Sequence, residues 1–289
     1  LAWLAKAIEG IESECEVIVS DNCSTDGTPE VIKKWEPAFD KTTFRVNRQS
    51  KNLGAIKNIA YCIDAATGKH VWTISDDDRI DVRTPSYVLQ VVKDHPDLAL
   101  MILNFSTRHI ETGEVGLERW FDVENDELSS DGKSIFERCL QVRKAGGVAL
   151  TTALVYRTDL AQRALQEWPA SYNNLGFQIY ITGFCALQGS VKLTKELYLT
   201  CLVGTHFWQK DKKIFLSFRY AEMPEVYVRL MNLGCSSEIC KKMVLKETRE
   251  IKWKFVKHCL KRWPITTTNV MIRHAAALLR VYFAARTAR

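Results

Sequence analysis

The feature that most constrains the fold is a regular alternation of helix-like and strand-like segments over the first hundred residues. Apolar residues recur at helical spacing over residues 2–11, and a β-branched run follows at 16–20. The same criteria predict further helices over 30–35 and 52–66, and further strands over 44–47, 69–75 and 98–105. Such connections are right-handed crossovers, so we expect a mostly parallel α/β sheet flanked by helices. Ligands then bind beyond the carboxyl ends of the strands.

Acidic residues follow two of these strands. Asp21 ends the first, and Asp76, Asp77 and Asp78 come directly after the strand at 69–75. Adjacent carboxylates repel one another and cost stability unless a cation or solvent screens them. Oxygen ligands favour Mg²⁺ or Mn²⁺, and Mg²⁺ completes its shell with phosphate oxygens and water. The cluster therefore predicts a metal-bound diphosphate, and the alternative is a solvated turn that caps the following helix.

Three segments carry a resemblance to a known family. They are VIVSDNCSTDGT at 17–28, the NLG sequence with an asparagine four residues later at 52–58, and GKHVWTISDDD at 68–78. In order and spacing they resemble the donor-binding half of family-2 glycosyltransferases, which have the GT-A fold. Residues 146–159 resemble, more loosely, the deoxysugar transferases of the abequosyltransferase type.

The resemblance implies roles for individual residues. Asp21 is expected to contact the nucleotide base, Asp76 to lie near the ribose, and Asp78 to bind the metal that bridges the diphosphate. A metal at this point stabilises the departing nucleoside diphosphate as a Lewis acid. The other residues that the resemblance places at the donor site are Asn52, Gly54, Asn58 and Asp77.

The implied function is transfer of a sugar from a nucleoside diphosphate sugar to a hydroxyl group of a glycan or lipid-linked acceptor. Bacterial surface polysaccharide or glycolipid synthesis in the cytoplasm is the implied setting. Family members begin with a strand that has no counterpart before Leu1, so we expect the first strand of the domain to be missing. Two alternatives stay open: a sugar-nucleotide pyrophosphorylase, and an inactive glycan-binding or scaffold protein of the same fold.

The catalytic base has no clear position in the sequence. Many family members carry a Glu-Asp pair about a hundred residues after the metal motif, where this chain has Gln178. Direct displacement needs a carboxylate or imidazole within reach of the acceptor hydroxyl. Asp159 is the base that we carry forward, although it could equally cap the helix that starts at Leu160. The other candidates are Asp122, Glu124 and His206.

The C-terminal part is strongly basic. Residues 241–289 contain 13 Lys or Arg against Glu247 and Glu250, whereas the rest of the chain is net acidic. We expect a GT-A domain at 1–205 and a helical basic extension at 206–289. The extension either packs on the domain or lies on an anionic membrane surface. No nucleic-acid-binding module accompanies the charge, so nucleic acid is not expected as a partner.

One stretch of this extension has an amphipathic pattern. Trp253, Val256, Leu260 and Trp263 fall on one helical face, with basic residues beside them. No apolar stretch reaches the roughly 18 to 20 uncharged residues that cross a bilayer. We therefore expect a cytoplasmic protein that at most lies on the inner face of the membrane.

Overall fold

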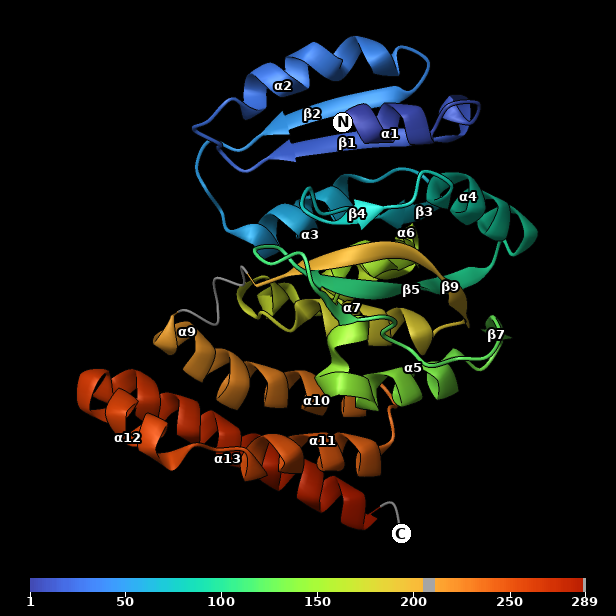
Figure 1. Ribbon diagram of the computed structural model, residues 1–289. Coiled ribbons are helices and arrows are strands. Elements are labelled where there is room, and N and C mark those ends of the chain that lie inside the picture. Colours follow the sequence, from blue (N-terminus) through green and yellow to red (C-terminus); the bar gives the residue numbers. More distant parts are fainter. Residues whose placement is uncertain (205–210, 288–289) are drawn as a thin grey trace.

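The structure, a computed structural model, describes residues 1–204 and 211–287. It is built in layers, from an N-terminal two-stranded sheet through a larger sheet to a stack of C-terminal helices (Figure 1). The strands are β1 (Glu16–Asp21), β2 (Thr43–Arg48), β3 (His70–Trp72), β4 (Arg79–Ile80), β5 (Leu98–His109), β6 (Val115–Leu117), β7 (Glu127–Ser129), β8 (Leu154–Arg157) and β9 (Ser190–Val203).

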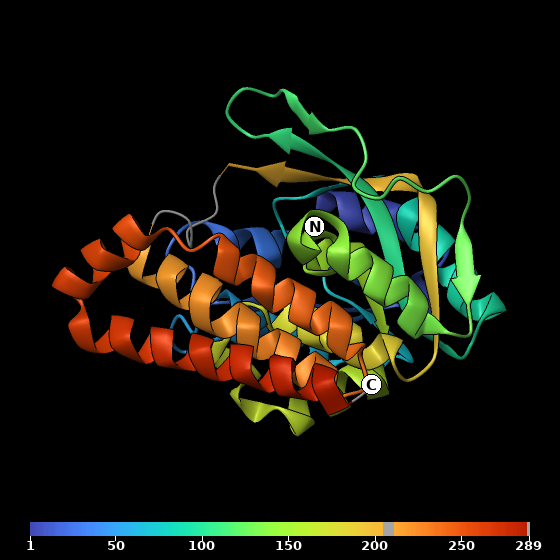
Figure 2. The same cartoon turned by 90° about the horizontal axis from the view of Figure 1, so that it is seen from below.

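The helices cover the larger sheet and then extend beyond it, and Figure 2 shows the C-terminal ones in front of the rest. They are α1 (Ala2–Ala7), α2 (Thr28–Trp35), α3 (Ala55–Ala65), α4 (Thr84–Asp94), α5 (Gly132–Gln141), α6 (Thr158–Glu167), α7 (Phe177–Ala186), α9 (Lys212–Ser217), α10 (Met223–Asn232), α11 (Ser237–Arg249), α12 (Trp253–Arg262) and α13 (Pro264–Thr287). Short 3-10 turns join several of them, and a π-helix, Phe218–Glu222, precedes α10.

The larger sheet is mixed rather than mostly parallel. β1 and β2 form a separate parallel pair, and the seven-stranded sheet has the order β3-β8-β5-β9-β4. Within it β5 and β9 are parallel, whereas β8 runs antiparallel to both β3 and β5. β3 and β5 therefore point the same way although they are not neighbours. The expected parallel direction is therefore found for β3 and β5. β8, which comes later in the chain, lies between them and runs the opposite way.

Most N-terminal elements lie where the sequence predicts them, with two differences. The strand expected over 69–75 pairs only over His70–Trp72, because beyond it the Ser75 amide donates to Thr152 Oγ1 at 3.1 Å instead of joining a ladder. Residues 111–131, for which the sequence predicts no strand, contain β6, which pairs with β5, and β7, which pairs with β9. Short edge strands of this kind carry too little periodicity to be recognised in the sequence.

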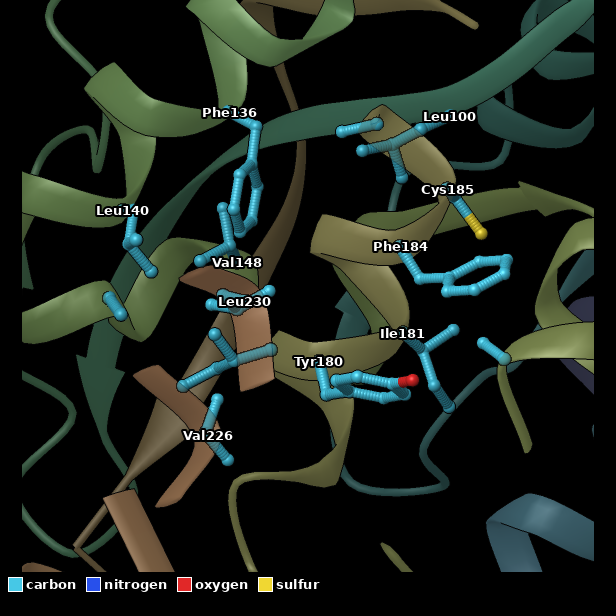
Figure 3. Packing of buried hydrophobic residues seen from close by; sticks show 14 of the residues in the cluster. Leu100, Phe136, Leu140, Val148, Tyr180, Ile181, Phe184, Cys185, Val226 and Leu230 are labelled. Atoms are coloured by element: carbon cyan, nitrogen blue, oxygen red, sulfur yellow. The ribbon is translucent and has the colours of Figure 1, made fainter. Parts of the chain in front are cut away.

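The core joins the sheet to the C-terminal helices. Every residue of α7 is buried, and its apolar side chains pack between the sheet and α10 (Figure 3). Phe136 of α5, Phe184 of α7 and Leu230 of α10 belong to one continuous buried cluster. The boundary predicted at residues 205 and 206 lies outside the described residues, and the helices that follow share the core of the domain before them.

Substituting Gly183 tests this packing. A Cβ at Gly183 would lie 2.3 Å from Leu230 Cδ2 and 2.8 Å from Phe136 Cζ, so Gly183→Ala forces both side chains to move. We expect a loss of about 1 to 3 kcal/mol in the free energy of unfolding, measured by urea denaturation. Gly27→Ala is the matched control, because a Cβ at Gly27 would meet no heavy atom within 4 Å and the residue has an ordinary φ of −71°. Equal stability of the two variants would contradict the packing.

Candidate functional site

Asp21 ends β1 and organises the loop that follows it. Its side chain is only 1% exposed, its Oδ1 accepts from the Ser24 amide at 2.8 Å, and its Oδ2 lies 3.4 Å from Arg48 Nε. Hydrogen bonds from Ser24, and then the charge of Arg48, hold the pKa of Asp21 below its usual range. The carboxylate is therefore ionised and points into its own loop. Cys23 in that loop has a φ of 65°, a left-handed conformation that suits a tight turn.

A second loop is fastened to the first by asparagines. Asn22 Nδ2 donates to Asn52 Oδ1 at 3.0 Å, and the Leu53 amide donates to Asn22 Oδ1 at 2.8 Å. Asn52 Oδ1 also accepts from the amide of Gly54, whose φ of 84° favours glycine. Asn52 and Gly54 thus shape the entry to α3. Asn22 was missed as a member of this set, and its position in a turn-rich segment is the signal that could have identified it.

Asn58 joins α3 to the end of β1. Its Nδ2 donates to the Ser20 carbonyl at 2.9 Å, and its Oδ1 accepts from Ser20 Oγ at 2.7 Å. Both polar atoms of the Asn58 amide are therefore used within the protein. Asn58 supports the position of Asp21 rather than presenting a free polar group.

The three consecutive aspartates differ in exposure. Asp76 and Asp77 are exposed, and Asp77 accepts a short hydrogen bond from Ser75 Oγ. Asp78 is half-buried and contacts the hydroxyl of Thr152, with the thiol of Cys201 and the Leu202 backbone beside it. Thr152 is itself held by Trp72, whose Nε1 donates to its carbonyl at 2.8 Å. Two later parts of the chain thus position Asp78.

The electrostatics single out Asp78. Burial raises the pKa of Asp78 above its ordinary value and the charge of Asp77 adds to this, while the hydrogen bonds oppose it. Burial and the neighbouring carboxylate of Asp78 raise the pKa of Cys201 to about 12, so the Cys201 thiol stays protonated. A half-buried carboxylate whose charged form is disfavoured is stabilised by a cation placed against it. This is the donor chemistry that a divalent ion needs from the protein.

No group of three or more His, Cys, Asp or Glu side chains in the described part of the chain is arranged to hold a metal by itself. Mg²⁺ characteristically takes one or two protein carboxylates and completes its shell with phosphate and water. Asp78, with Asp76 and Asp77 beside it, fits such an incomplete set. The residues present therefore suit a metal that arrives with a diphosphate.

The ends of β1 and β3 face the same edge of the molecule. α3 begins beside the end of β1, where Asn58 holds Ser20, and the chain after α3 passes the start of β1, where Glu16 Oε1 accepts from the Gly68 amide at 2.8 Å. β3 therefore begins beside the beginning of β1. Figure 1 shows the arrowheads of β1, β2 and β9 on one side, and Asp78 reaches the end of β9. This arrangement supports a shared site for Asp21 and the three aspartates.

Asp159, the base carried forward from the sequence, lies near the start of β3. Arg157 pairs with His70 at the start of β3, and the Asp159 carboxylate forms an ion pair with Arg157 at 2.7 Å. Asp76 lies beyond the other end of β3, which the structure places at Trp72. Asp159 lines a separate cavity of about 530 Å³ together with Lys69. The structure thus gives Asp159 a partner in Arg157 and does not bring it to the aspartate cluster.

The other positions considered for the base differ in their surroundings. Gln178 is buried and donates to the hydroxyl of Tyr156 at 2.6 Å, which is a packing role. Asp122 and Glu124 are exposed on the segment between β6 and β7. His206 lies outside the described residues.

Comparison with known proteins finds a family model that matches less than half of the chain, and solved structures that share the fold. Residues 1–127 match the model of Glycosyl transferase family 2. The abequosyltransferase RfbV of Salmonella typhimurium is 33% identical over 72 residues, which are 25% of this chain and 21% of that protein. The matched stretch is therefore a minor part of this relative.

Solved structures of the S. aureus protein TarS have the same fold. TarS 1–349 in complex with UDP-GlcNAc superposes with a TM-score of 0.68 at 17% identity, covering 96% of this chain and 76% of that chain. The complex of TarS 1–349 with UDP gives a TM-score of 0.61 at 16% identity, with 100% and 86% covered. In a longer TarS structure the match spans 39% of the TarS chain. The predicted GT-A fold with C-terminal helices is confirmed, with a mixed sheet.

Proposed function

From the similarity of residues 1–127 to family-2 glycosyltransferases, we propose that the chain transfers a glycosyl group from a nucleoside diphosphate sugar to a hydroxyl acceptor. The observation that carries this proposal is Asp78, a half-buried carboxylate at the edge where β3 and β9 end. The loop ordered by Asp21 lies at the same edge and provides a surface for the nucleotide. Both features suit a donor in which an anionic diphosphate joins a neutral nucleoside to a neutral sugar.

Mg²⁺ or Mn²⁺ would be held by Asp78, with Asp76 and Asp77 beside it. When bound, such an ion offsets the negative charge that develops on the departing nucleoside diphosphate. The protein's part is to hold Asp78 in one position through Thr152 and the end of β9, and to keep it half-shielded from water. Because electrostatic interactions strengthen as water is excluded, this placement favours departure of the diphosphate.

The acceptor that we propose is a glycan or a lipid-linked sugar in bacterial surface polysaccharide or glycolipid synthesis. The support is the similarity of 72 residues to an abequosyltransferase. The stretch is short, so the nucleotide and the sugar of the donor are to be found by experiment.

A second candidate is an inactive glycan-binding protein of the same fold. The observation that favours it is Gln178, a buried amide at the position where related enzymes carry an acid. Such a protein could bind a nucleotide sugar and leave it intact. Turnover of a donor separates the two candidates.

The test is an assay of donor hydrolysis with a panel of UDP-, CDP- and GDP-sugars, each with Mn²⁺ and with a chelator. We expect release of the nucleoside diphosphate from at least one donor, dependent on the metal and lost in Asp78→Asn. Asp159→Asn should retain the activity, because its carboxylate pairs with Arg157 at the other end of the sheet. Binding of a donor without any release of diphosphate would favour the inactive protein instead.

A further inference from the structure

The outermost helix of the molecule, α13, has an apolar face that no described part of the chain covers. Its inner face buries Val270, Ala277 and Val281 against the neighbouring helices. The outer face presents large apolar side chains at intervals of seven and four residues, so they line up along one side. We call them the outer stripe: Ile265 (86% exposed), Ile272 (63%), Leu279 (56%) and Phe283 (58%).

The charged residues of the segment that carries the outer stripe are all basic. Residues 251–289 contain no Asp or Glu. In the neighbouring helix α12, the Lys254, Lys257 and Lys261 side chains are exposed, and so are the apolar side chains of Trp253 and Leu260. This corrects the amphipathic face expected from the sequence, because Val256 is buried whereas its expected partners Trp253 and Leu260 are not. Exposed apolar groups therefore lie among cations on both helices.

The nearest acids in the sequence are paired within the protein. Glu247 and Glu250 of the preceding segment both pair with Arg219, at 2.5 and 2.9 Å. A small cavity of about 220 Å³ opens between α9 and α12 and is lined by Lys212, Lys252 and two phenylalanines, Phe215 and Phe255. Two lysines beside aromatic rings add an anion-attracting depression to the same end of the molecule.

We propose that the outer stripe and the lysines of α12 form a docking surface for an anionic lipid bilayer. An interfacial helix buries its apolar face at the level of the headgroups while basic residues beside it attract anionic lipids. A second copy of the chain fits less well, because two basic segments without any acid of their own would be brought together and would repel one another. No helix of the described residues is long and apolar enough to cross a membrane, so the contact is with the surface.

This inference is independent of the donor site, and the two can fail separately. If both hold, the surface brings the enzyme to the place where a lipid-linked acceptor resides. Figure 1 shows α12 and α13 at the opposite end of the molecule from β1 and β2, with the larger sheet between them. The docking surface and the loop that follows Asp21 therefore lie on different parts of the molecule.

Vesicle binding tests the docking surface. The whole protein is sedimented with vesicles of phosphatidylcholine alone and of phosphatidylcholine with about 30% phosphatidylglycerol, at low and high salt. We expect binding to the anionic vesicles that weakens as salt rises, because salt screens the lysines. Binding should fall about fivefold for each lysine removed in Lys254→Gln, Lys257→Gln and Lys261→Gln. Ile272→Ser combined with Leu279→Ser should weaken it roughly tenfold or more.

Matched controls and a second measurement decide the outcome. Val31→Ser and Val115→Ser replace exposed apolar residues elsewhere and should bind as the wild type does. Circular dichroism and thermal melting report whether each variant is folded. Equal binding to both kinds of vesicle, or none to either, would overturn the proposal. So would light scattering that shows a dimer in the wild type and a monomer in the Ile272→Ser and Leu279→Ser variant, since the stripe would then be a contact between copies.

Discussion

Replacing Asp78 by alanine is expected to remove the metal-dependent part of nucleotide binding. Asp78 is the member of the aspartate cluster that Thr152 and the end of β9 hold in place, and burial raises its pKa. A metal bridging to a diphosphate depends on such a fixed carboxylate. We therefore expect UDP, CDP or GDP to bind about 100-fold less tightly in the presence of Mn²⁺, a loss of about 3 kcal/mol. Titration calorimetry with and without Mn²⁺ measures the metal-dependent and the metal-independent affinity for the nucleotide.

The control for this result is Asp94→Ala, which removes an exposed carboxylate from α4. It should bind as the wild type does. A metal-dependent titration of normal strength by Asp78→Ala would show that the metal, if it binds, is held elsewhere.

Stability distinguishes loss of a ligand from loss of the fold. Because the folded state raises the pKa of Asp78, its ionised form is less favourable in the folded chain than in the unfolded one. The contribution of this group to stability is present below the unfolded pKa of aspartate and is lost as pH rises through the higher folded pKa. Asp78→Asn removes that cost at neutral pH, so the metal-free variant should melt no lower than the wild type.

Asp21→Ala is expected to weaken nucleotide binding while leaving its metal dependence intact. The buried carboxylate of Asp21 accepts from the Ser24 amide and lies close to Arg48, so its loss releases the loop between β1 and α2. Removing a charge-assisted hydrogen bond of this kind costs about 1.5 kcal/mol, or about tenfold in affinity. The ratio of the dissociation constants with and without Mn²⁺ should stay at the wild-type value.

Asp26→Ala is the comparison for Asp21, because Asp26 sits in the same loop but is exposed and bonds only to Thr28. Its affinity for nucleotide should change little. If Asp21→Ala abolished the metal dependence as well, Asp21 and Asp78 would not have the separate roles proposed here, nucleotide contact for the first and metal binding for the second.

The local part of the fold could be predicted because it is encoded locally. Helical and strand periodicity identified β1, β2 and α3 to within a few residues, since apolar spacing is a property of neighbouring positions. The place of β8 could not be predicted in the same way. β8 pairs with β3 across more than 80 residues of sequence. The residues of the two strands do not indicate whether they pair in parallel or antiparallel, or in which register.

The same limit applies to the site. The turn and acid residues that follow β1 and β3 are contiguous in sequence, so Asp21 and Asp78 could be singled out. Thr152 and Cys201, which hold Asp78, come from segments that approach it only in the folded chain. The position of Asp159 could not be predicted for a related reason, because it depends on the antiparallel direction of β8, which sets Arg157 opposite His70.

The C-terminal helices show how a turn changes an amphipathic prediction. One continuous face through Trp253 and Trp263 was expected, but α12 ends at Arg262 and Pro264 begins α13. After that turn the exposed apolar side chains continue on α13 at seven-residue spacing. Periodicity within either helix was visible in the sequence, whereas which face each helix buries depends on the helices packed against it.

A crystal structure with a nucleoside diphosphate and Mn²⁺, with the ion located by anomalous scattering, tests the role of Asp78 most directly. We expect Mn²⁺ bound to both the diphosphate and a carboxylate oxygen of Asp78, with the nucleoside against the loop that follows Asp21. An ion and nucleotide bound elsewhere, with Asp78 still turned to Thr152 and touching neither, would contradict this role.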